Sequence, residues 1–513
     1  MSPARGRRRP SDASATMMLQ AIRLIALAIA LHGSAHAADS RSVLSFHGGY
    51  DRSGSFLVPG LTAQRARGTH IDAGFQAVLA GHLYAQPLFL HDPETNAGIL
   101  FAATESNDVH ALEATTGREL WRRSLGPPVS RSALRCGNIN PLGVTGTPVI
   151  DPETQAIYVA AALAAPQGVR HRVFALRVGD GSPLPGWPVD VAAALGQQGL
   201  AFNSRDQNQR GALTIVNGRL YVPFGGHYGD CGDYHGWVVG ISLRNPQEVI
   251  TWNTPARGGG IWAPGGISSD GTSLYVATGN TFGANRWMGG EAIIRLSQEL
   301  RTSNDARDYF APENWQSLDA RDLDLGGTNP VLVDAPGDGG DRPLLLALGK
   351  DGHAYLLDRA NLGGIGQSLV NEAVSTQSIR TAPAAYRVAD GAFVAFQGRG
   401  ARCPAGRPAG DLTALKITAR DRPALVTAWC AAVRGGGSPI VTTTDGHSDP
   451  IVWMVGAEGD NRLHAIDGAT GEALSPGGGA SEALEGLRHF QTLIATDGRI
   501  YVGADGRIYA FAF

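Results

Sequence analysis

Several features that would assign this 513-residue chain to a common class are missing. Its formal net charge is only −3, so the chain lacks the basic excess that nucleic-acid binding requires. It has no CxxCH motif, which excludes a covalently attached haem. Its N-terminal apolar run, within residues 19–31, is nearer a dozen residues than the roughly 20 that a membrane-spanning helix needs. These features therefore imply no nucleic-acid partner, no covalently attached haem and no membrane-spanning helix at the N-terminus.

The N-terminus predicts a secretory signal peptide over residues 1–37. Basic GRRRP precedes the apolar segment, and Ala-His-Ala at 35–37 is a small-x-small cleavage site. Met17 and Met18 are alternative starts, because either gives a more ordinary signal length. A membrane anchor is the competing interpretation. We expect a periplasmic or secreted mature protein with no membrane span after signal removal.

Four cysteines in an oxidising compartment predict two disulfides. Cys403 and Cys430 form the simpler pair, because both fall within one repeat. Cys136 and Cys231 would then join the second repeat to the third. Each bond would stabilise the fold by about 2–4 kcal/mol.

A short β-rich segment recurs eight times along the chain, and 69 Gly with 29 Pro indicate many turns. The copies begin at LFAA (100), YVAA (158), YVPF (221), YVAT (275), LLAL (345), VAFQ (394), WMVG (453) and YVGA (501). A third strand with a turn follows several copies, and DVHALEATTGREL (108–120) nearly repeats as RLHAIDGATGEAL (462–474). Such a period, with several short strands in each unit, is typical of a β-propeller.

The repeat therefore predicts an all-β fold, an eight-bladed β-propeller of four-stranded antiparallel blades over residues 38–513. Its period exceeds the about 40–45 residues of WD40 repeats, whose GH and WD signatures are absent. We expect residues between about 40 and 80 to close the ring by supplying the last outer strand. The tryptophans of the repeats should pack between neighbouring blades: Trp121, Trp187, Trp252 and Trp429.

The turn A-L/I-D/E-x-x-T-G-x-x-L/W, repeated in eight blades, resembles the pyrroloquinoline quinone-like propeller repeat. That repeat occurs in quinoprotein alcohol dehydrogenases and in outer-membrane assembly factor propellers. The resemblance covers the whole chain after the signal. Because the same repeat serves enzymes and scaffolds, it predicts the fold and leaves the function open.

Residues 258–359 resemble the dehydrogenases more specifically. In that family a Trp lies under the quinone ring, an Asn ligates a metal, an Asp abstracts the alcohol proton and a basic residue contacts the quinone. Trp262, Asn280, Asp322 and Lys350 occur in that order here. A flat aromatic face, a carbonyl ligand, a carboxylate base and a lysine suit this chemistry.

The resemblance implies two bound groups. Pyrroloquinoline quinone would be held by Trp262, Lys350, Thr145 and Arg170. Ca²⁺ or a lanthanide would be held by Asn280, Asp322 and Asp324, since the Asp-x-Asp pair resembles that of lanthanide-using members. The chain departs from the family where Pro166 stands in place of a metal-binding Glu, and where Cys136 stands alone instead of in an adjacent Cys pair.

The residues by themselves allow simpler interpretations. Asn280 would also suit a turn, DLDLGG a solvated loop, and KDG at 350–352 a hairpin turn. A second group, His227, Cys231 and His235, has the i, i+4, i+8 spacing of metal ligands, or belongs to a loop held by a disulfide. Anion contacts near the axis are expected from Arg205, Arg210, Arg257 and Arg380.

Three functions remain open at this point. The first is a quinoprotein-like oxidoreductase that oxidises an alcohol and passes electrons to an external acceptor. The second is a cofactor-free scaffold that binds a protein or glycan of the cell envelope. The third is metal-dependent hydrolysis at the His227 and His235 loop.

Overall fold

The computed structural model describes residue 1 and residues 41–513, except 93–96, 304, 390, 407–409, 420–421 and 476–481. Ser40–Phe513 form one compact unit. Apart from its first residue, the signal peptide predicted over 1–37 lies outside the described residues. In the described part of the chain, every helix is too short or too polar to cross a membrane.

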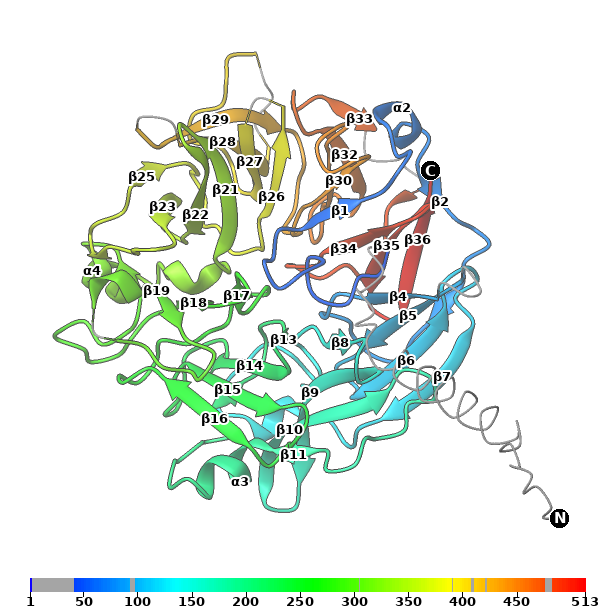
Figure 1. Cartoon of the computed structure of the whole chain (residues 1–513), viewed down its shortest axis with the longest axis vertical. Helices are drawn as coiled ribbons and strands as arrows, with labels where there is room; N and C mark the ends of the chain where they lie inside the picture. Colours follow the sequence, from blue (N-terminus) through cyan, green and yellow to red (C-terminus); the bar gives the residue numbers. More distant parts are fainter. Residues whose placement is uncertain are drawn as a thin grey trace. The chain divides into compact units, whose positions relative to one another are not determined.

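The described residues form eight small sheets around a common hub (Figure 1), which confirms the predicted eight-bladed β-propeller. The first four blades are β4 (Leu88–Asp92), β5 (Ala97–Ala103), β6 (Asp108–Glu113), β7 (Glu119–Ser124); β8 (Val149–Asp151), β9 (Ala156–Ala165), β10 (Gly168–Arg177), β11 (Val189–Asp190); β12 (Gln207–Asn208), β13 (Thr214–Val216), β14 (Arg219–Gly226), β15 (Trp237–Ser242), β16 (Val249–Asn253); and β17 (Ser268–Ser269), β18 (Leu274–Thr278), β19 (Ala292–Leu296), β20 (Tyr309–Ala311), β24 (Gly364–Ile365).

The other four blades are β21 (Val331–Gly337), β22 (Gly340–Leu348), β23 (His353–Asp358), β25 (Val370–Ala373); β26 (Ala384–Val388), β27 (Gly391–Gln397), β28 (Leu412–Thr418), β29 (Ala424–Ala431); β1 (Ser55–Leu57), β30 (Ile440–Thr443), β31 (Ile451–Val455), β32 (Leu463–Asp467), β33 (Ala473–Ser475); and β2 (His70–Ile71), β3 (Ala77–Val78), β34 (Leu493–Thr496), β35 (Arg499–Ala504), β36 (Arg507–Ala512). Short helices of the described residues lie in connections: α2 (Ala63–Ala66), α3 (Val191–Gly196), α4 (Trp315–Arg321) and 3-10 turns at Arg131–Ala133, Ala306–Asp308 and Leu325–Gly327.

The repeated segment occupies the same strand in every blade. Its eight copies lie in β5, β9, β14, β18, β22, β27, β31 and β35, each the second strand of its sheet when the added parallel strand β1 of the seventh blade is not counted. Each of these strands pairs with the first strand on one side and the third on the other. The predicted register is therefore confirmed.

The ring closes as predicted. In the eighth blade β2 and β3 pair antiparallel with β36, with His70 opposite Ala512 and Ala77 opposite Ile508. An N-terminal segment thus completes the blade formed by the C-terminal strands, so that neither end of the ring presents an unpaired strand edge.

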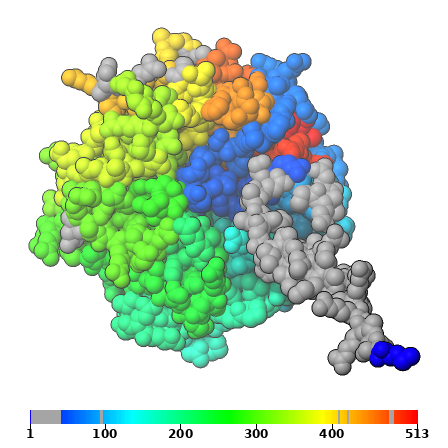
Figure 2. Space-filling model, viewed as in Figure 1, coloured from blue at the N-terminus to red at the C-terminus, as the bar shows by residue number. Residues whose placement is uncertain are grey.

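Residues 43–58, which we call the N-terminal plug, have a role other than the outer strand predicted for this region. The plug hydrogen-bonds to the inner strands of the first, second, fourth, sixth and seventh blades: Val43 to Phe89, Leu44 to Ile150, Tyr50 to Ser269, Ser53 to Ala385 and Gly54 to Val441. Its strand β1 runs parallel to β30. Figure 2 shows this segment in dark blue near the middle of one face. The plug therefore ties the blades together at the hub.

Most buried apolar side chains form clusters between neighbouring blades. One such cluster lies between the second and third blades and includes Val149 and Ile241. The predicted role of the tryptophans is confirmed for two of them. Trp121 Nε1 donates to Val178 of the next blade, and Trp429 Nε1 donates to Gly468 of the next blade. Gly471 lies against the Trp429 ring at a distance where a Cβ would clash, so the TG turn requires its glycine.

Both predicted disulfides are present and use all four cysteines. The Cα atoms are 6.0 Å apart in Cys136–Cys231 and 5.7 Å apart in Cys403–Cys430. The first bond joins the connection after β7 to the loop between β14 and β15, and the second lies within the sixth blade.

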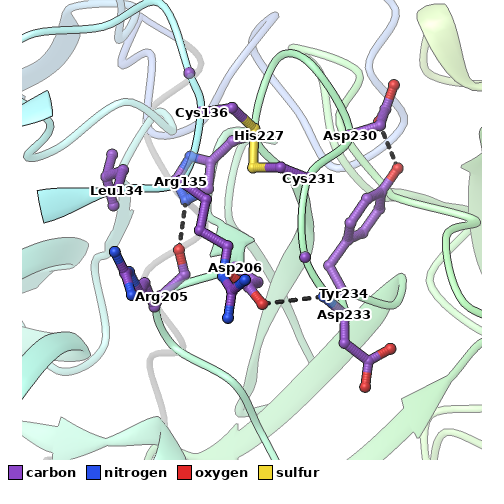
Figure 3. The surroundings of a disulfide bond; sticks show 12 residues. Leu134, Arg135, Cys136, Arg205, Asp206, His227, Asp230, Cys231, Asp233 and Tyr234 are labelled. Carbon is purple, nitrogen blue, oxygen red and sulfur yellow. Dashed lines mark hydrogen bonds and ion pairs between the residues drawn. A yellow bond between two sulfur atoms is a disulfide. The ribbon is translucent and has the colours of Figure 1, made fainter. Parts of the chain in front are cut away.

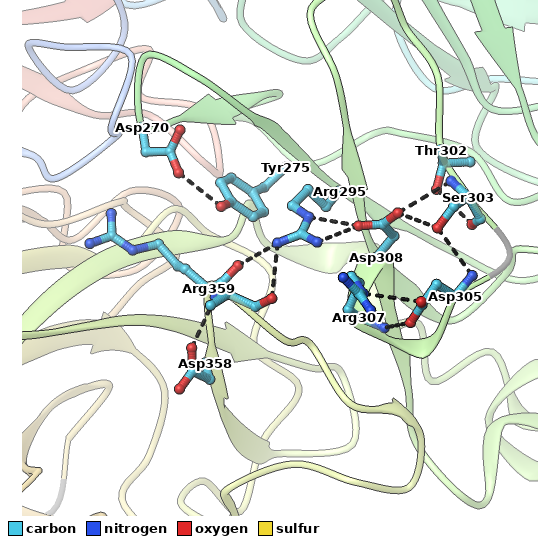
Figure 4. A network of polar contacts seen from close by, with 11 residues as sticks. Asp270, Tyr275, Arg295, Thr302, Ser303, Asp305, Arg307, Asp308, Asp358 and Arg359 are labelled. Carbon is cyan, nitrogen blue, oxygen red and sulfur yellow. Dashed lines mark hydrogen bonds and ion pairs between the residues drawn. The ribbon is translucent and has the colours of Figure 1, made fainter.

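The Arg295 side chain joins the fourth blade to the fifth (Figure 4). Arg295 of β19 donates through Nε to Asp308 Oδ1 at 2.8 Å and through Nη1 to the Arg359 carbonyl at 2.8 Å. Both charged side chains are mostly buried, at 18% and 17% exposure. Since Arg359 belongs to the fifth blade, Arg295 links two sheets.

We expect Arg295→Gln to lower the free energy of unfolding by about 2 kcal/mol, because it removes charged hydrogen bonds from a mostly buried site. Arg307→Gln is the matched control: its pair with Asp305 is exposed and should contribute less than about 0.5 kcal/mol. Urea denaturation followed by circular dichroism measures both. Equal effects of the two variants would contradict a special role for Arg295.

Candidate functional site

The structure brings together five of the predicted site residues from four segments. Trp262 lies in the connection before β17, and Asn280 follows β18. Asp322 and Asp324 follow α4, and Lys350 follows β22. The fourth and fifth blades and the connections before them therefore supply the group.

Lys350 is the centre of this group. Its Nζ lies 2.9 Å from Asp322 Oδ1, 3.1 Å from Asp324 Oδ1 and 5.1 Å from the centre of the Trp262 ring. Asp324 Oδ2 accepts a 2.7 Å hydrogen bond from Trp262 Nε1, and Asp322 Oδ1 accepts one of 3.1 Å from Asn280 Nδ2. The indole plane and the ammonium are thus held by one carboxylate.

The two carboxylates differ in environment. Asp324 is 5% exposed, and burial raises its pKa to about 6 although Lys350 opposes this shift. The Asp322 side chain is 68% exposed. Its burial also acts to raise the pKa, but the hydrogen bond and charge of Lys350 outweigh it and lower the pKa below its usual value. Asp322 therefore is an ionised, accessible carboxylate.

The backbone around the carboxylates is unusual. Asp322 ends α4 in the left-handed region, with φ of 54°, and Glu291 has φ of 51°. Such conformations cost about 1–3 kcal/mol and are concentrated at functional sites. At Gly279 a Cβ would lie 2.6 Å from Asp324 Oδ2, so only glycine allows this close approach.

Glu291 supports the group from inside. It is fully buried, and its Oε2 accepts a 2.6 Å hydrogen bond from the Leu325 amide, which follows Asp324 directly. Burial, together with the charge of Asp324, raises the pKa of Glu291 well above its usual value. Glu291 therefore positions the turn after Asp324.

Two further charged groups, of which Arg210 lies near Trp262, interact electrostatically with each other. The Arg210 guanidinium lies 5.9 Å from the Trp262 ring centre and 4.4 Å from that of Phe490, and no hydrogen bond or ion pair to it is found among the described residues. Glu105 is fully buried and accepts a 2.7 Å hydrogen bond from Thr145 Oγ1. Burial raises the pKa of Glu105 to about 7. Sequence reasoning missed Glu105, because no motif surrounds it.

Arg170 is not brought to this group. Its closest charged partner is Asp190, with Nη1 3.7 Å from Oδ1. Pro166, which stands in place of the family's metal-binding Glu, is exposed in the turn between β9 and β10.

The metal-ligand interpretation of His227, Cys231 and His235 is wrong. Cys231 is bonded to Cys136, and a ring nitrogen of His227 donates to the Arg205 carbonyl (Figure 3). A ring nitrogen of His235 donates to the Thr254 carbonyl. Among the described residues, no three His, Cys, Asp or Glu side chains gather so as to hold a metal ion.

Part of the chain matches a known protein family. A family model described as outer membrane protein assembly factor BamB matches residues 86–293. Residues 86–293 are therefore similar to the pyrroloquinoline quinone-like β-propeller repeat family, which supports the resemblance seen in the sequence. None of the curated protein sequences matches this chain.

The fold is also similar to solved dehydrogenases. A quinohemoprotein alcohol dehydrogenase from Pseudomonas putida aligns with a TM-score of 0.65 and 16% identity, over 92% of this chain and 80% of that one. A europium-containing methanol dehydrogenase aligns with a TM-score of 0.62 and 14% identity, over 93% and 98%. A quinohemoprotein alcohol dehydrogenase from Comamonas testosteroni gives 0.60 and 16%, over 93% and 81%. At these identities the likeness shows the fold alone.

Proposed function

We propose that this protein is a periplasmic or secreted oxidoreductase that binds pyrroloquinoline quinone on Trp262, oxidises an alcohol and passes the electrons to an external acceptor. One observation carries the proposal: Lys350 and Arg210 both lie within 6 Å of the Trp262 ring centre. A flat ligand with anionic groups would stack on the indole and meet both cations. Two disulfides fit an oxidising compartment.

Each residue has a defined task in this proposal. The bound quinone supplies an acceptor for the hydride of the alcohol. Asp322, ionised and accessible, takes the proton of the substrate hydroxyl. Lys350 polarises the quinone carbonyls and keeps Asp322 ionised, and Asp324 orients both Lys350 and the indole. Thr145, bonded to Glu105, offers a further contact to the quinone.

The donor set falls short of a Ca²⁺ or lanthanide site. Ca²⁺ takes about 6–8 oxygen ligands. Here both carboxylates already pair with Lys350, and the remaining donor is Asn280 Oδ1, which is buried and has no hydrogen-bond partner in the described residues. The proposed steps therefore use no metal ion.

A cofactor-free scaffold that binds a cell-envelope protein or glycan is the second candidate. The matching family model, named for an outer-membrane assembly factor, favours it. In that case Lys350 and Arg210 would serve only to stabilise the hub.

An absorbance titration with pyrroloquinoline quinone, without metal and with Ca²⁺ or La³⁺, separates the two candidates. We expect saturable uptake by the wild-type protein, and affinity at least about tenfold weaker in Trp262→Ala, which loses the stacking surface. Trp252→Ala, on the outer strand β16, should bind the quinone as the wild type does. No uptake under any of the three conditions would reject the oxidoreductase and leave the scaffold.

A further inference from the structure

A pocket of about 570 Å³ lies beside the second blade, and none of its wall residues belongs to the group around Lys350. The turn between β9 and β10 forms one wall, and the segments around Val129 and Phe202 form the others. Its volume is in the range of small-molecule sites, about 300–1,000 Å³.

The wall of this pocket carries positive charge only. It contains Arg170 and Arg205 and no acidic side chain. Asp190, the partner of Arg170, also lies 3.4 Å from Arg172 and accepts a hydrogen bond from the Ala193 amide. One carboxylate therefore serves two guanidinium groups, which leaves Arg170 incompletely neutralised.

Arg205 has no ion pair in the described part of the chain. Its Nε donates to the Ala133 carbonyl at 3.0 Å, and its own carbonyl accepts from His227 at 3.1 Å. The neighbouring Asp206 is engaged with Arg135, Asn203 and the Asp233 amide. Figure 3 shows this arrangement beside the Cys136–Cys231 bond, with the guanidinium of Arg205 directed away from the disulfide. The disulfide loop thus holds the Arg205 backbone in place.

The buried part of the pocket wall, which we call the floor, consists of Val129, Phe202 and Ser204 and is apolar apart from one hydroxyl. Val129 and Phe202 are buried, and the Phe202 ring is fixed by edge contacts with His171 and Phe224. Ser204 is 8% exposed, and its Oγ is buried with no hydrogen-bond partner among the described residues. Buried hydroxyls are normally bonded, so this oxygen indicates a missing polar partner.

We propose that this pocket binds a small organic monocarboxylate, with its carboxylate between Arg170 and Arg205 and its short apolar chain against Val129 and Phe202. Guanidinium groups bind carboxylates through paired hydrogen bonds, and the apolar floor selects against a bare anion. The inference does not depend on quinone binding.

Isothermal titration of the mature, quinone-free protein with hexanoate, acetate and hexan-1-ol tests the proposal. We expect hexanoate to bind, and acetate and hexan-1-ol to bind at least about tenfold more weakly. Acetate lacks the apolar chain that contacts the floor, and hexan-1-ol lacks the carboxylate that pairs with the arginines. Equal affinity for acetate would overturn the role of the apolar floor, and equal affinity for hexan-1-ol would overturn that of the arginines. No hexanoate binding at millimolar concentration would overturn the site.

Variants locate the ligand. Arg170→Gln and Arg205→Gln should each weaken hexanoate binding at least about tenfold. Arg177→Gln is the matched control, because Arg177 lies on the same strand β10 but does not line the pocket, and it should bind hexanoate normally. Equal loss in all three would overturn the assignment. Melting temperatures identify a variant that fails to fold. In that case the relative affinities of the wild-type protein for hexanoate, acetate and hexan-1-ol test the proposal without the variant.

Discussion

Replacing Arg52 with alanine should lower the free energy of unfolding by about 4 kcal/mol. Arg52 lies in the N-terminal plug, is fully buried and donates to the carbonyls of Phe46, Leu213 and Ile267 at 2.8–3.1 Å, as well as to Thr214 Oγ1. Burial lowers its pKa to about 9, so it remains charged at neutral pH. Truncation would leave several buried carbonyls without a donor, each costing about 1–3 kcal/mol.

Guanidinium denaturation of the variant measures this effect. Arg65→Ala is the control, since Arg65 lies in the same N-terminal region, is exposed, and its guanidinium donates to the Phe513 carbonyl. It should change stability by less than about 0.5 kcal/mol. Arg52→Lys should recover only part of the loss, because an ammonium cannot reproduce the planar set of donors. A loss below about 1 kcal/mol in Arg52→Ala would show that the plug contributes little.

Asp322→Asn should reduce alcohol oxidation by about 10²–10⁴-fold, the usual contribution of a general base. The amide cannot accept the substrate proton, yet it keeps the shape of the side chain and a hydrogen-bond acceptor for Lys350. Quinone affinity should therefore stay near that of the wild type. Steady-state rates with a panel of primary alcohols and an artificial electron acceptor, together with the absorbance titration, measure the two quantities separately.

Asp351→Asn provides a matched carboxylate change. Asp351 follows Lys350 directly, but its Oδ2 accepts from Tyr355 and its Oδ1 from the His353 amide, away from the proposed reaction. Its variant should keep most of the turnover. Full activity in Asp322→Asn would remove Asp322 from the mechanism, whereas parallel loss of quinone binding would assign it to cofactor binding instead.

The eight blades could be predicted because every blade packs against its two neighbours in the same way. Each sheet is buried against both neighbours, so its second strand repeats as a short apolar run such as YVAA or YVAT. The TG turn repeats because its glycine lies too close to the preceding blade to carry a Cβ, against the Trp429 side chain at Gly471 and against the backbone of residues 76–77 at Gly117. These patterns are local, and they recur along the sequence at a spacing regular enough to be recognised. The disulfide pairing followed from the compartment and from the position of the cysteines within the repeats.

The site was predicted in part. The order of Trp262, Asn280, Asp322 and Lys350 along the chain came from a family resemblance, and the structure brings these residues together. That Lys350 pairs with both Asp322 and Asp324 depends on the turn after α4 meeting the end of β22. No spacing along the sequence could indicate whether a lysine or a metal ion lies between those carboxylates.

The sequence by itself determined the propeller, its closure by N-terminal residues and its four bonded cysteines, because these follow from repetition and local turn chemistry. Only the tertiary structure decided the plug, the burial of Glu105 and the placement of Arg170 in the wall of a separate pocket. Arg52 bonds to carbonyls 161 and 215 residues away, and such contacts leave no periodic signal. From the sequence alone, a charged residue in an irregular segment is expected at the surface. Only the closed ring shows that Arg52 is buried.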